Sequence, residues 1–274
     1  MIRYLRSYPA LSLAFLAMVL GVAPLALVKA GLLPQGATQL GALSASLAGL
    51  ILAVVTGGRA DLRALLGRAL IWRVPARYWL FALFFPILPS VAALYLYALV
   101  GGPAPDWSEL KPIWSVIPMF MILTIFAGFG EEFGWRGYAL PRLLPKFNAL
   151  QASLLIGFLW GIWHTPLFLT EGTVQSAWAA EGGYLLGMGG YTAFCMAWSV
   201  QYTWLFRATR GSVLLAAVMH GAGNAWFGGY IDVYRGHLGG ILTFAVVMAL
   251  VSAGLVARYG PSLQRRDGVM SRAS

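Results

Sequence analysis

Eight predominantly apolar runs most narrowly limit what this chain can fold into. Each run is close to the roughly 20 residues that an α-helix needs to cross about 30 Å of hydrocarbon. The runs lie at residues 11–29, 39–57, 78–100, 113–131, 149–170, 185–206, 212–230 and 238–257. Because a backbone in lipid must satisfy its own hydrogen bonds, runs of this length form helices. We therefore predict an all-α polytopic membrane protein, a bundle of about eight transmembrane helices.

The composition excludes several other classes of protein. Charged residues make up 10% of the chain and hydrophobic residues 59%, whereas average globular chains carry about 25% charged residues. A soluble enzyme and a disordered chain are therefore excluded. The net charge of +10 does not indicate a nucleic-acid partner, because the basic residues form no stripe or face. The single cysteine, Cys195, lies inside an apolar run, which excludes a disulfide framework and a CxxC metal site.

Most arginine and lysine residues fall in connectors that the predicted spans place on one side. If the N-terminus lies in the cytoplasm, only Lys29, Lys111 and Arg235 fall on the outer side. This asymmetry follows the positive-inside rule, by which cytoplasmic loops of membrane proteins carry an excess of basic residues. We therefore expect a multi-pass protein of the cell (inner) membrane, surrounded by membrane lipids, with both termini in the cytoplasm.

The predicted spans fall into three parts of a single bundle domain. Residues 1–112 carry the first three spans and, at 59–77, leucines at helical spacing with arginines between them. This pattern is typical of an amphipathic helix on an anionic membrane surface, so we expect a cytoplasmic interfacial helix there. Residues 113–230 form a core with the next four spans, and residues 231–274 hold the last span and a basic cytoplasmic tail.

A few ionisable side chains lie inside the predicted spans and not in connectors. Ionisable groups in hydrocarbon cost about 2.5–3.5 kcal/mol each on insertion scales and mark function by default. Together with one amide, Asn224, these residues are Glu131, Glu132, Arg136, His164 and His220. They come from three predicted helices, and the rest of the bundle is nearly free of charge. This group is the candidate functional site.

The spacing of the charged residues on the fourth predicted helix indicates separate roles. Glu132 and Arg136 are four residues apart, so they share a helix face and can form an ion pair. Glu131 is rotated by about 100° from Glu132 and can point into the bundle. If this helix continues to about Leu140 and the next begins near Ser153, then Glu131, His164 and His220 all lie about 10–17 Å below the cytoplasmic face. We expect this arrangement.

Two further pairs show the same spacing of four residues. Trp160 precedes His164, and His220 precedes Asn224, so each pair shares one helix face. A buried carboxylate, two imidazoles and an amide suit one kind of chemistry. The carboxylate, assisted by a histidine, can activate water, while separate donors stabilise a developing oxyanion.

Three segments resemble the motifs of the CPBP intramembrane protease family, which includes type II CAAX prenyl endopeptidases and bacteriocin-processing or bacteriocin-immunity membrane proteins. GEEFGWRGYALPRL (130–143) is similar to its E-E-x-x-x-R motif. LIGFLWGIWHTPLFL is similar to F-x-x-x-H at His164, with Trp160 where the family usually has Phe. GSVLLAAVMHGAGN is similar to H-x-x-x-N/D at His220 and Asn224. The resemblance covers about residues 113–230 and implies that these residues are a protease core.

The resemblance implies an intramembrane endopeptidase with assigned site residues. It implies that Glu131 and His164 activate a water molecule, and that His220 and Asn224 stabilise the tetrahedral oxyanion. The residues that it assigns to supporting positions are Glu132, Arg136 and, as the aromatic neighbour of the first histidine, Trp160.

The family resemblance leaves the role of a metal open. Members are commonly described as metalloproteases, which makes Glu131, His164 and His220 candidate zinc ligands. Two histidines and a carboxylate are a known zinc ligand set, but the chain has no HExxH motif. We expect metal-free catalysis by glutamate and histidine and keep a zinc-assisted site as the alternative.

The expected partner is a peptide or protein substrate at the membrane that reaches the site from the cytoplasmic side. More specifically, we expect a substrate that is CAAX-like or otherwise lipid-modified.

A proton-coupled transporter that uses the carboxylates and histidines as a relay is one alternative function. Transporters usually show repeat symmetry, and no internal repeat is visible in this sequence. A non-enzymatic membrane scaffold or immunity protein is the other alternative. An inactive descendant would be expected to lose Glu131 or His164, and this chain keeps both.

Overall fold

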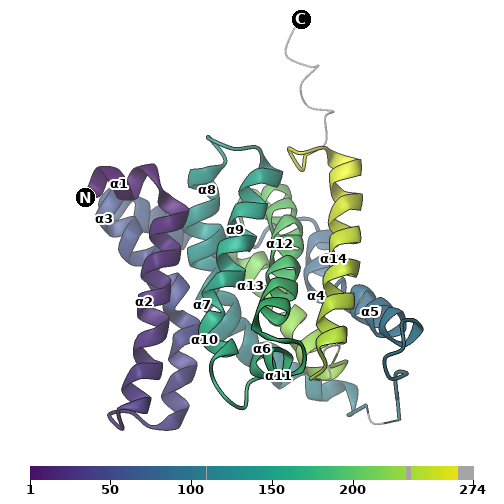
Figure 1. The fold of residues 1–274 in the computed structure, drawn as a ribbon. Helices are drawn as coiled ribbons and strands as arrows, with labels where there is room; N and C mark the ends of the chain where they lie inside the picture. Colours follow the sequence, from purple (N-terminus) through teal and green to yellow (C-terminus); the bar gives the residue numbers. More distant parts are fainter. Residues whose placement is uncertain (109, 233–235, 265–274) are drawn as a thin grey trace, which may run out of the picture.

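A computed structural model of the chain describes residues 1–108, 110–232 and 236–264. Within these residues every regular element is a helix, and the longer helices pack side by side as a bundle (Figure 1). The prediction of an all-α polytopic membrane protein is confirmed. The predicted outer Arg235 and the predicted basic tail beyond residue 264 lie outside the described residues.

Five helical segments of the described chain are long and apolar enough to cross a membrane. They are Pro9–Lys29, Leu40–Leu70, Ala76–Leu99, Ile113–Leu143 and Leu238–Tyr259. The other three predicted spans are also helical, as α9 (Ala149–Trp163), α12 (Tyr184–Ala208) and α13 (Val213–Ala225). Two of them, α9 and α13, contain only 15 and 13 residues, fewer than the roughly 20 that a membrane-spanning helix needs. The third, α12, carries Gly, Thr, Ser and Gln between its apolar residues.

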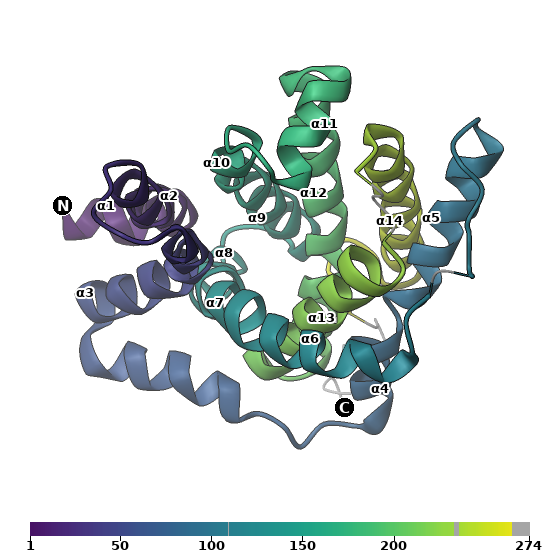
Figure 2. The same ribbon diagram turned by 90° about the horizontal axis from the view of Figure 1, so that it is seen from below.

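The N-terminal part of the bundle contains a sharp change of direction. Its elements are α1 (Ile2–Ser7), α2 (Pro9–Lys29), η1 (Gln35–Leu43), α3 (Ser44–Gly67), η2 (Arg68–Leu70), α4 (Ala76–Phe84) and α5 (Ile87–Leu99). Gly58 breaks α3 with a φ of 68°, a backbone conformation that glycine adopts without steric cost. From Arg59 the helix runs across one end of the bundle toward α4 (Figure 2).

This crossing segment corresponds to the predicted interfacial helix. Leu65 is buried against the bundle while Arg63 is exposed, as an amphipathic surface helix requires. The helical part ends at Leu70 and does not reach residue 77 as predicted. Pro75, which comes directly before α4, lacks an N–H group and disfavours helix in the residue before it.

The fourth long helix runs without interruption through the site region. It consists of η3 (Ile113–Ser115), α6 (Val116–Leu123), η4 (Thr124–Gly128), α7 (Phe129–Glu132), η5 (Phe133–Ala139) and α8 (Leu140–Leu143). The predicted continuation to about Leu140 is confirmed. Two of its segments, η4 and η5, are π-helical and flank α7. Such π segments are frequent at functional sites, because they break the regular side-chain register.

The next helix begins earlier than predicted. It starts at Ala149 and not near Ser153. The Asn148 side chain accepts a hydrogen bond from the backbone N–H of Gln151 at 2.9 Å, and the Gln151 side chain accepts one from the backbone N–H of Asn148 at 3.2 Å. This reciprocal capping box fixes the helix start.

The remaining elements complete the bundle around α12. After α9 they are α10 (Thr165–Phe168), α11 (Val174–Gly182), α12, α13, η6 (Trp226–Tyr230) and α14 (Leu238–Tyr259). Glycines let the central helices approach closely, as is common between membrane helices. A Cβ at Gly157 of α9 would overlap the backbone of Met196 in α12. A Cβ at Gly134 would overlap the carbonyl oxygen of Ala45 in α3.

The two ends of the bundle differ in their connectors. The arginine end, the upper end in Figure 1, comprises α1, residues 59–77, 142–150, 207–213 and the last turn of α14. The polar contacts that join these segments are Arg6 to the Thr56 carbonyl, Lys146 to the Ser7 carbonyl, Arg142 to Asp61, Arg210 to the Arg73 carbonyl and Arg207 to Gln264. The loop end, opposite to it, comprises residues 30–43, 100–108, 110–112, 164–183, 226–232 and 236–238.

Candidate active site

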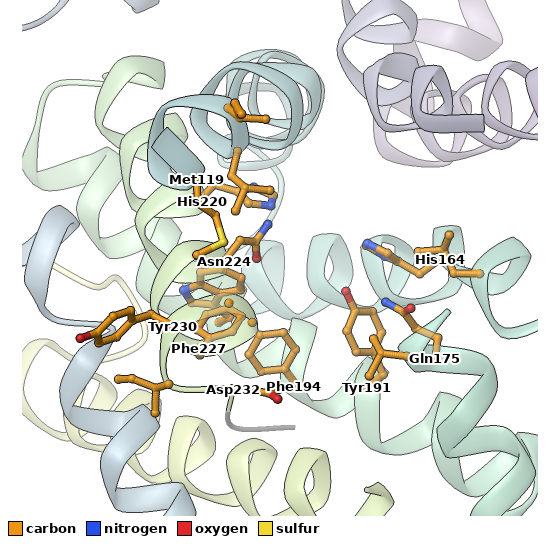
Figure 3. Close-up of a pocket in the computed structure, with 18 of the residues that line it drawn as sticks. Met119, His164, Gln175, Tyr191, Phe194, His220, Asn224, Phe227, Tyr230 and Asp232 are labelled. Atoms are coloured by element: carbon orange, nitrogen blue, oxygen red, sulfur yellow. The ribbon is translucent and has the colours of Figure 1, made fainter. Parts of the chain in front are cut away.

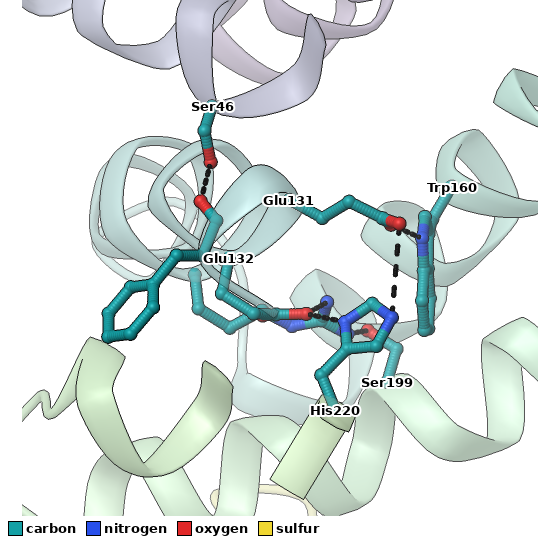
Figure 4. Close-up of polar contacts among 8 residues, drawn as sticks. Ser46, Glu131, Glu132, Trp160, Ser199 and His220 are labelled. Atoms are coloured by element: carbon teal, nitrogen blue, oxygen red, sulfur yellow. Dashed lines mark hydrogen bonds and ion pairs between the residues drawn. The ribbon is translucent and has the colours of Figure 1, made fainter. Parts of the chain in front are cut away.

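Glu131 lies in the interior of the bundle, on the short α7 between the two π segments. Its side chain is 6% exposed. One carboxylate oxygen, Oε2, accepts a hydrogen bond from Nε1 of Trp160 at 2.6 Å. The other, Oε1, lies 3.8 Å from Nε2 of His220 (Figure 4). The indole therefore fixes the direction of the carboxylate and leaves Oε1 beside the imidazole.

Glu132 is fully buried and connects two helices. Its Oε1 accepts a hydrogen bond from Nη1 of Arg136 at 3.0 Å, which is the ion pair that the spacing predicted. The same oxygen lies 2.8 Å from Nδ1 of His220, 88 residues further along the chain (Figure 4). Glu132 therefore positions the imidazole of His220, a role that the sequence did not predict.

Arg136 is fully buried, and its guanidinium group is packed among aromatic rings. Its guanidinium carbon lies 4.0 Å from the ring centre of Tyr202 and 4.8 Å from that of Trp160. Nη2 also donates a hydrogen bond to the hydroxyl oxygen of Ser199 at 3.3 Å. A buried cation is stable only when it is paired and hydrogen-bonded, and the carboxylate, the rings and the hydroxyl together provide this.

The hydrogen bonds of the two histidines define what each ring can do. Nδ1 of His164 lies 2.8 Å from the carbonyl oxygen of Trp160, and a carbonyl only accepts, so Nδ1 carries the proton. The neutral ring then has its lone pair on Nε2. Nδ1 of His220 likewise donates to the carboxylate of Glu132. Its Nε2 becomes a donor when this ring is protonated.

A cavity of about 1080 Å³ connects the candidate residues. Figure 3 shows His164 on one side of this cavity and His220 with Asn224 on the other, all directed inward. The predicted residues that line it are Glu131, Trp160, His164, His220 and Asn224. The histidines and Glu131 are nearly inaccessible to solvent, whereas Asn224 is partly exposed. The structure thus brings all five to one pocket.

The two remaining predicted residues lie behind the cavity wall. Glu132 and Arg136 have no exposed surface and do not line the cavity. Each contacts a residue that does line the cavity. Glu132 is hydrogen-bonded to the imidazole of His220, and Arg136 packs against the ring of Trp160. Ser46 in α3 braces this region, because its hydroxyl donates to the carbonyl oxygen of Phe129 at 2.7 Å (Figure 4).

Sequence reasoning missed the contribution of α12. The ring of Tyr191 lies 4.9 Å from that of His164. The rings of Trp198 and Tyr202 lie 5.6 and 6.1 Å from that of His220. These aromatic residues recur at helical spacing in a predicted span that also carries Ser, Thr and Gln. That polar and aromatic pattern, in a helix too hydrophilic to face lipid, is the signal that could have found them.

The metal-ligating side chains do not form a metal site in this arrangement. Within residues 1–108, 110–232 and 236–264, no three or more His, Cys, Asp or Glu side chains are grouped so as to hold a metal ion. Glu131 and His220 are adjacent, but Oε2 of Glu131 is already bonded to the Trp160 indole. We therefore derive no step through a metal.

Comparison with known proteins gives a family match over the core and one curated relative. Residues 113–226 match the family described as type II CAAX prenyl endopeptidase Rce1-like. A CAAX prenyl protease 2 of Methanococcus maripaludis is 32% identical over 112 residues. That alignment covers 38% of this chain and 37% of the relative, so the chain matches well under two thirds of the relative's length. The family match spans the helices that carry Glu131, His164 and His220.

Proposed function

We propose that this chain, which belongs to the CPBP family through its type II CAAX prenyl endopeptidase Rce1-like segment at residues 113–226, is an intramembrane endopeptidase. Its substrate is a membrane-associated polypeptide, and more specifically one that is CAAX-like or lipid-modified. The observation that carries it is the buried Glu131 carboxylate, which shares one cavity with His164, His220 and Asn224.

Glu131 acts as the general base in this proposal. Trp160 holds Oε2, so Oε1 is the oxygen that takes a proton from a water molecule in the cavity. The Nε2 lone pair of His164 accepts a hydrogen bond from the other proton of the same water and orients it. The water oxygen then attacks the carbonyl carbon of the substrate, and the carbonyl electron pair moves onto its oxygen. A general base of this kind contributes about 10²–10⁴ in rate.

His220 and Asn224 stabilise the resulting oxyanion. They lie on one face of α13 and both border the cavity. A protonated His220 donates from Nε2, and the Asn224 amide donates a second hydrogen bond. With His220 protonated, two carboxylates are balanced by one imidazolium and Arg136, so the buried cluster is neutral. The C–N bond then breaks, and the proton on Glu131 passes to the leaving nitrogen.

The test is the variant Glu131→Gln, which keeps an acceptor for the Trp160 indole but removes the base. We expect cleavage of internally quenched peptides, with and without a C-terminal prenylcysteine, to fall by about 10²–10⁴. The matched control is Glu171→Gln, because Glu171 is an exposed acid of the loop end that does not border the catalytic cavity.

Both variants should purify in detergent with the thermal stability of the parent, since each substitution is isosteric. Parent-level cleavage by Glu131→Gln would refute the assignment of the base. Uptake of a solute into liposomes by the parent, without cleavage of any peptide, would refute the peptidase and favour a transporter.

A further inference from the structure

The two ends of the bundle carry different charges. Over the described parts of the chain, the charged residues of the loop end are Asp106, Lys111, Glu171, Glu181 and Asp232, and Lys29 at the end of α2 directly precedes it. At the arginine end the described acid is Asp61, which pairs with Arg142 at 2.6 Å, among basic residues from α1 to the last turn of α14. Basic residues concentrate on the cytoplasmic side of membrane proteins. The arginine end therefore faces the cytoplasm.

The catalytic cavity extends from the site to the loop end. Its lining begins at the buried Glu131 and His220 and reaches Asp106, Lys111 and Asp232, which are exposed. Asp106 and Lys111 belong to the connector before the fourth long helix, and Asp232 follows η6. Solvent exposure thus increases from the site toward the loop end, which locates the mouth of the cavity there.

Toward the arginine end the same site is closed. Tyr138, Leu140 and Val213 lie between the cluster and the arginine end along the fourth long helix and α13, and each has no exposed surface. A methyl group at Gly137 would overlap the side chain of Leu65 from the crossing segment. Close packing of this kind leaves no passage for a polypeptide.

We propose that the substrate enters from the extracytoplasmic side, as a membrane-anchored polypeptide whose scissile bond lies at that face. The proposal rests on the proposed function and departs from the sequence-based expectation of access from the cytoplasm. That expectation came from the basic connectors and from the predicted depth of the site, about 10–17 Å below the cytoplasmic face, and neither specifies at which end the cavity opens.

The length of the passage defines what must enter. His220 and Tyr230 are ten residues apart on α13 and η6, or about 15 Å at the rise of a helix. An extended chain covers about 3.3 Å per residue, so four or five substrate residues reach from the mouth to the site. Gln175, Lys111 and Asp232 along this path can hydrogen-bond the backbone of such a segment.

A second cavity supports an anchored substrate. It has a volume of about 230 Å³, lies between α2, η1 and α10, and shares Glu131 and His164 with the first. Its α2 side is apolar, with Met18 and Leu25. An apolar part of the substrate at this side and an extended segment in the larger cavity would meet at the catalytic carboxylate.

Cysteine labelling in a bacterial inner membrane tests the direction of entry. The parent is the unlabelled reference, because its single cysteine, Cys195, is buried. With a membrane-impermeant maleimide, we expect Lys111→Cys and Glu171→Cys to react in intact spheroplasts. Arg63→Cys and Arg258→Cys should react only after the membrane is permeabilised. The reverse pattern, or equal labelling of both pairs in intact spheroplasts, overturns the proposal.

A pair of single-span test substrates separates this inference from the proposed function. Both carry one cleavable peptide beside the span, outside the membrane in one and inside in the other. Cleavage of the outside form alone supports the proposal, and cleavage of the inside form, alone or equally with the outside form, overturns it. If neither is cleaved while labelling follows the expected pattern, the peptidase assignment fails and the direction of the cavity stands.

Discussion

Glu131 and Glu132 are consecutive in the chain, but the surroundings of their carboxylates differ. Glu131 receives a hydrogen bond from an indole and borders the cavity. Glu132 is fully buried and is shared between Arg136 and His220. The first carboxylate retains an oxygen for a reacting proton, whereas the second is committed to holding other side chains. Their separate roles follow from these contacts.

We predict that Glu132 positions His220 in addition to pairing with Arg136. Glu132→Leu leaves a buried cation without its partner, which typically costs about 3–5 kcal/mol of stability. Adding Arg136→Met removes that cation, so the double variant should regain much of the lost stability in thermal unfolding. It should not regain cleavage, because His220 is still unanchored. A double variant with parent-level kcat/KM would show that Glu132 serves only the ion pair.

We also predict that cleavage does not require a metal. Glu131 and His220 are adjacent, but the described residues provide no cluster of three ligating side chains around a common point. Exhaustive chelation should therefore leave kcat unchanged in protein whose metal content, measured by elemental analysis, is far below one ion per chain. Loss of activity on chelation, with recovery on adding Zn²⁺, would instead support a zinc-assisted site.

At the scale of the elements, the packing of α9 against α12 fixes the depth of Trp160 and His164. The two helices are in close contact at Gly157, since a Cβ there would overlap the backbone of α12 and no side-chain rotation can relieve the overlap. Small residues permit this approach between membrane helices. The position of α9 therefore depends on the missing side chain at Gly157 and, one turn further on, at Gly161, where a Cβ would overlap Thr192 of α12.

Gly157→Ala should destabilise the protein by about 1–3 kcal/mol, the usual effect of overpacking. It should also lower kcat, because α9 must shift and carries Trp160 and His164 with it. Gly189→Ala on α12 is the matched control, since a Cβ there meets open space. The measurements are thermal unfolding in detergent and peptide cleavage. Equal stability of the two variants would contradict a close contact at Gly157.

For the whole molecule, features that depend on composition or on local spacing could be predicted from the sequence. Contacts between residues far apart in the chain could not. The helical class follows from the apolar runs, and the pairing of Glu132 with Arg136 follows from helical periodicity. The bond between Glu132 and His220 joins residues 88 positions apart, which no local pattern encodes. The aromatic wall from α12 depends on helix packing in the same way. The end at which the cavity opens depends on how loops fold over it.

The last prediction concerns the membrane as part of the substrate-binding apparatus. The catalytic carboxylate is buried in the bundle and borders both cavities, so a substrate held at the bilayer is delivered to it at high local concentration. A 14-carbon acyl chain gives a peptide a membrane association constant of about 10⁴ M⁻¹. In proteoliposomes, an acylated peptide at micromolar concentration should be cleaved with kcat/KM on the order of tenfold or more above the same peptide without the chain.

Because anchoring raises local concentration and leaves the chemical step unchanged, the gain should appear in KM and not in kcat. Glu131→Gln should cleave neither form. Equal kcat/KM for both peptides would mean that the site is supplied from bulk water, contrary to its depth in the bundle.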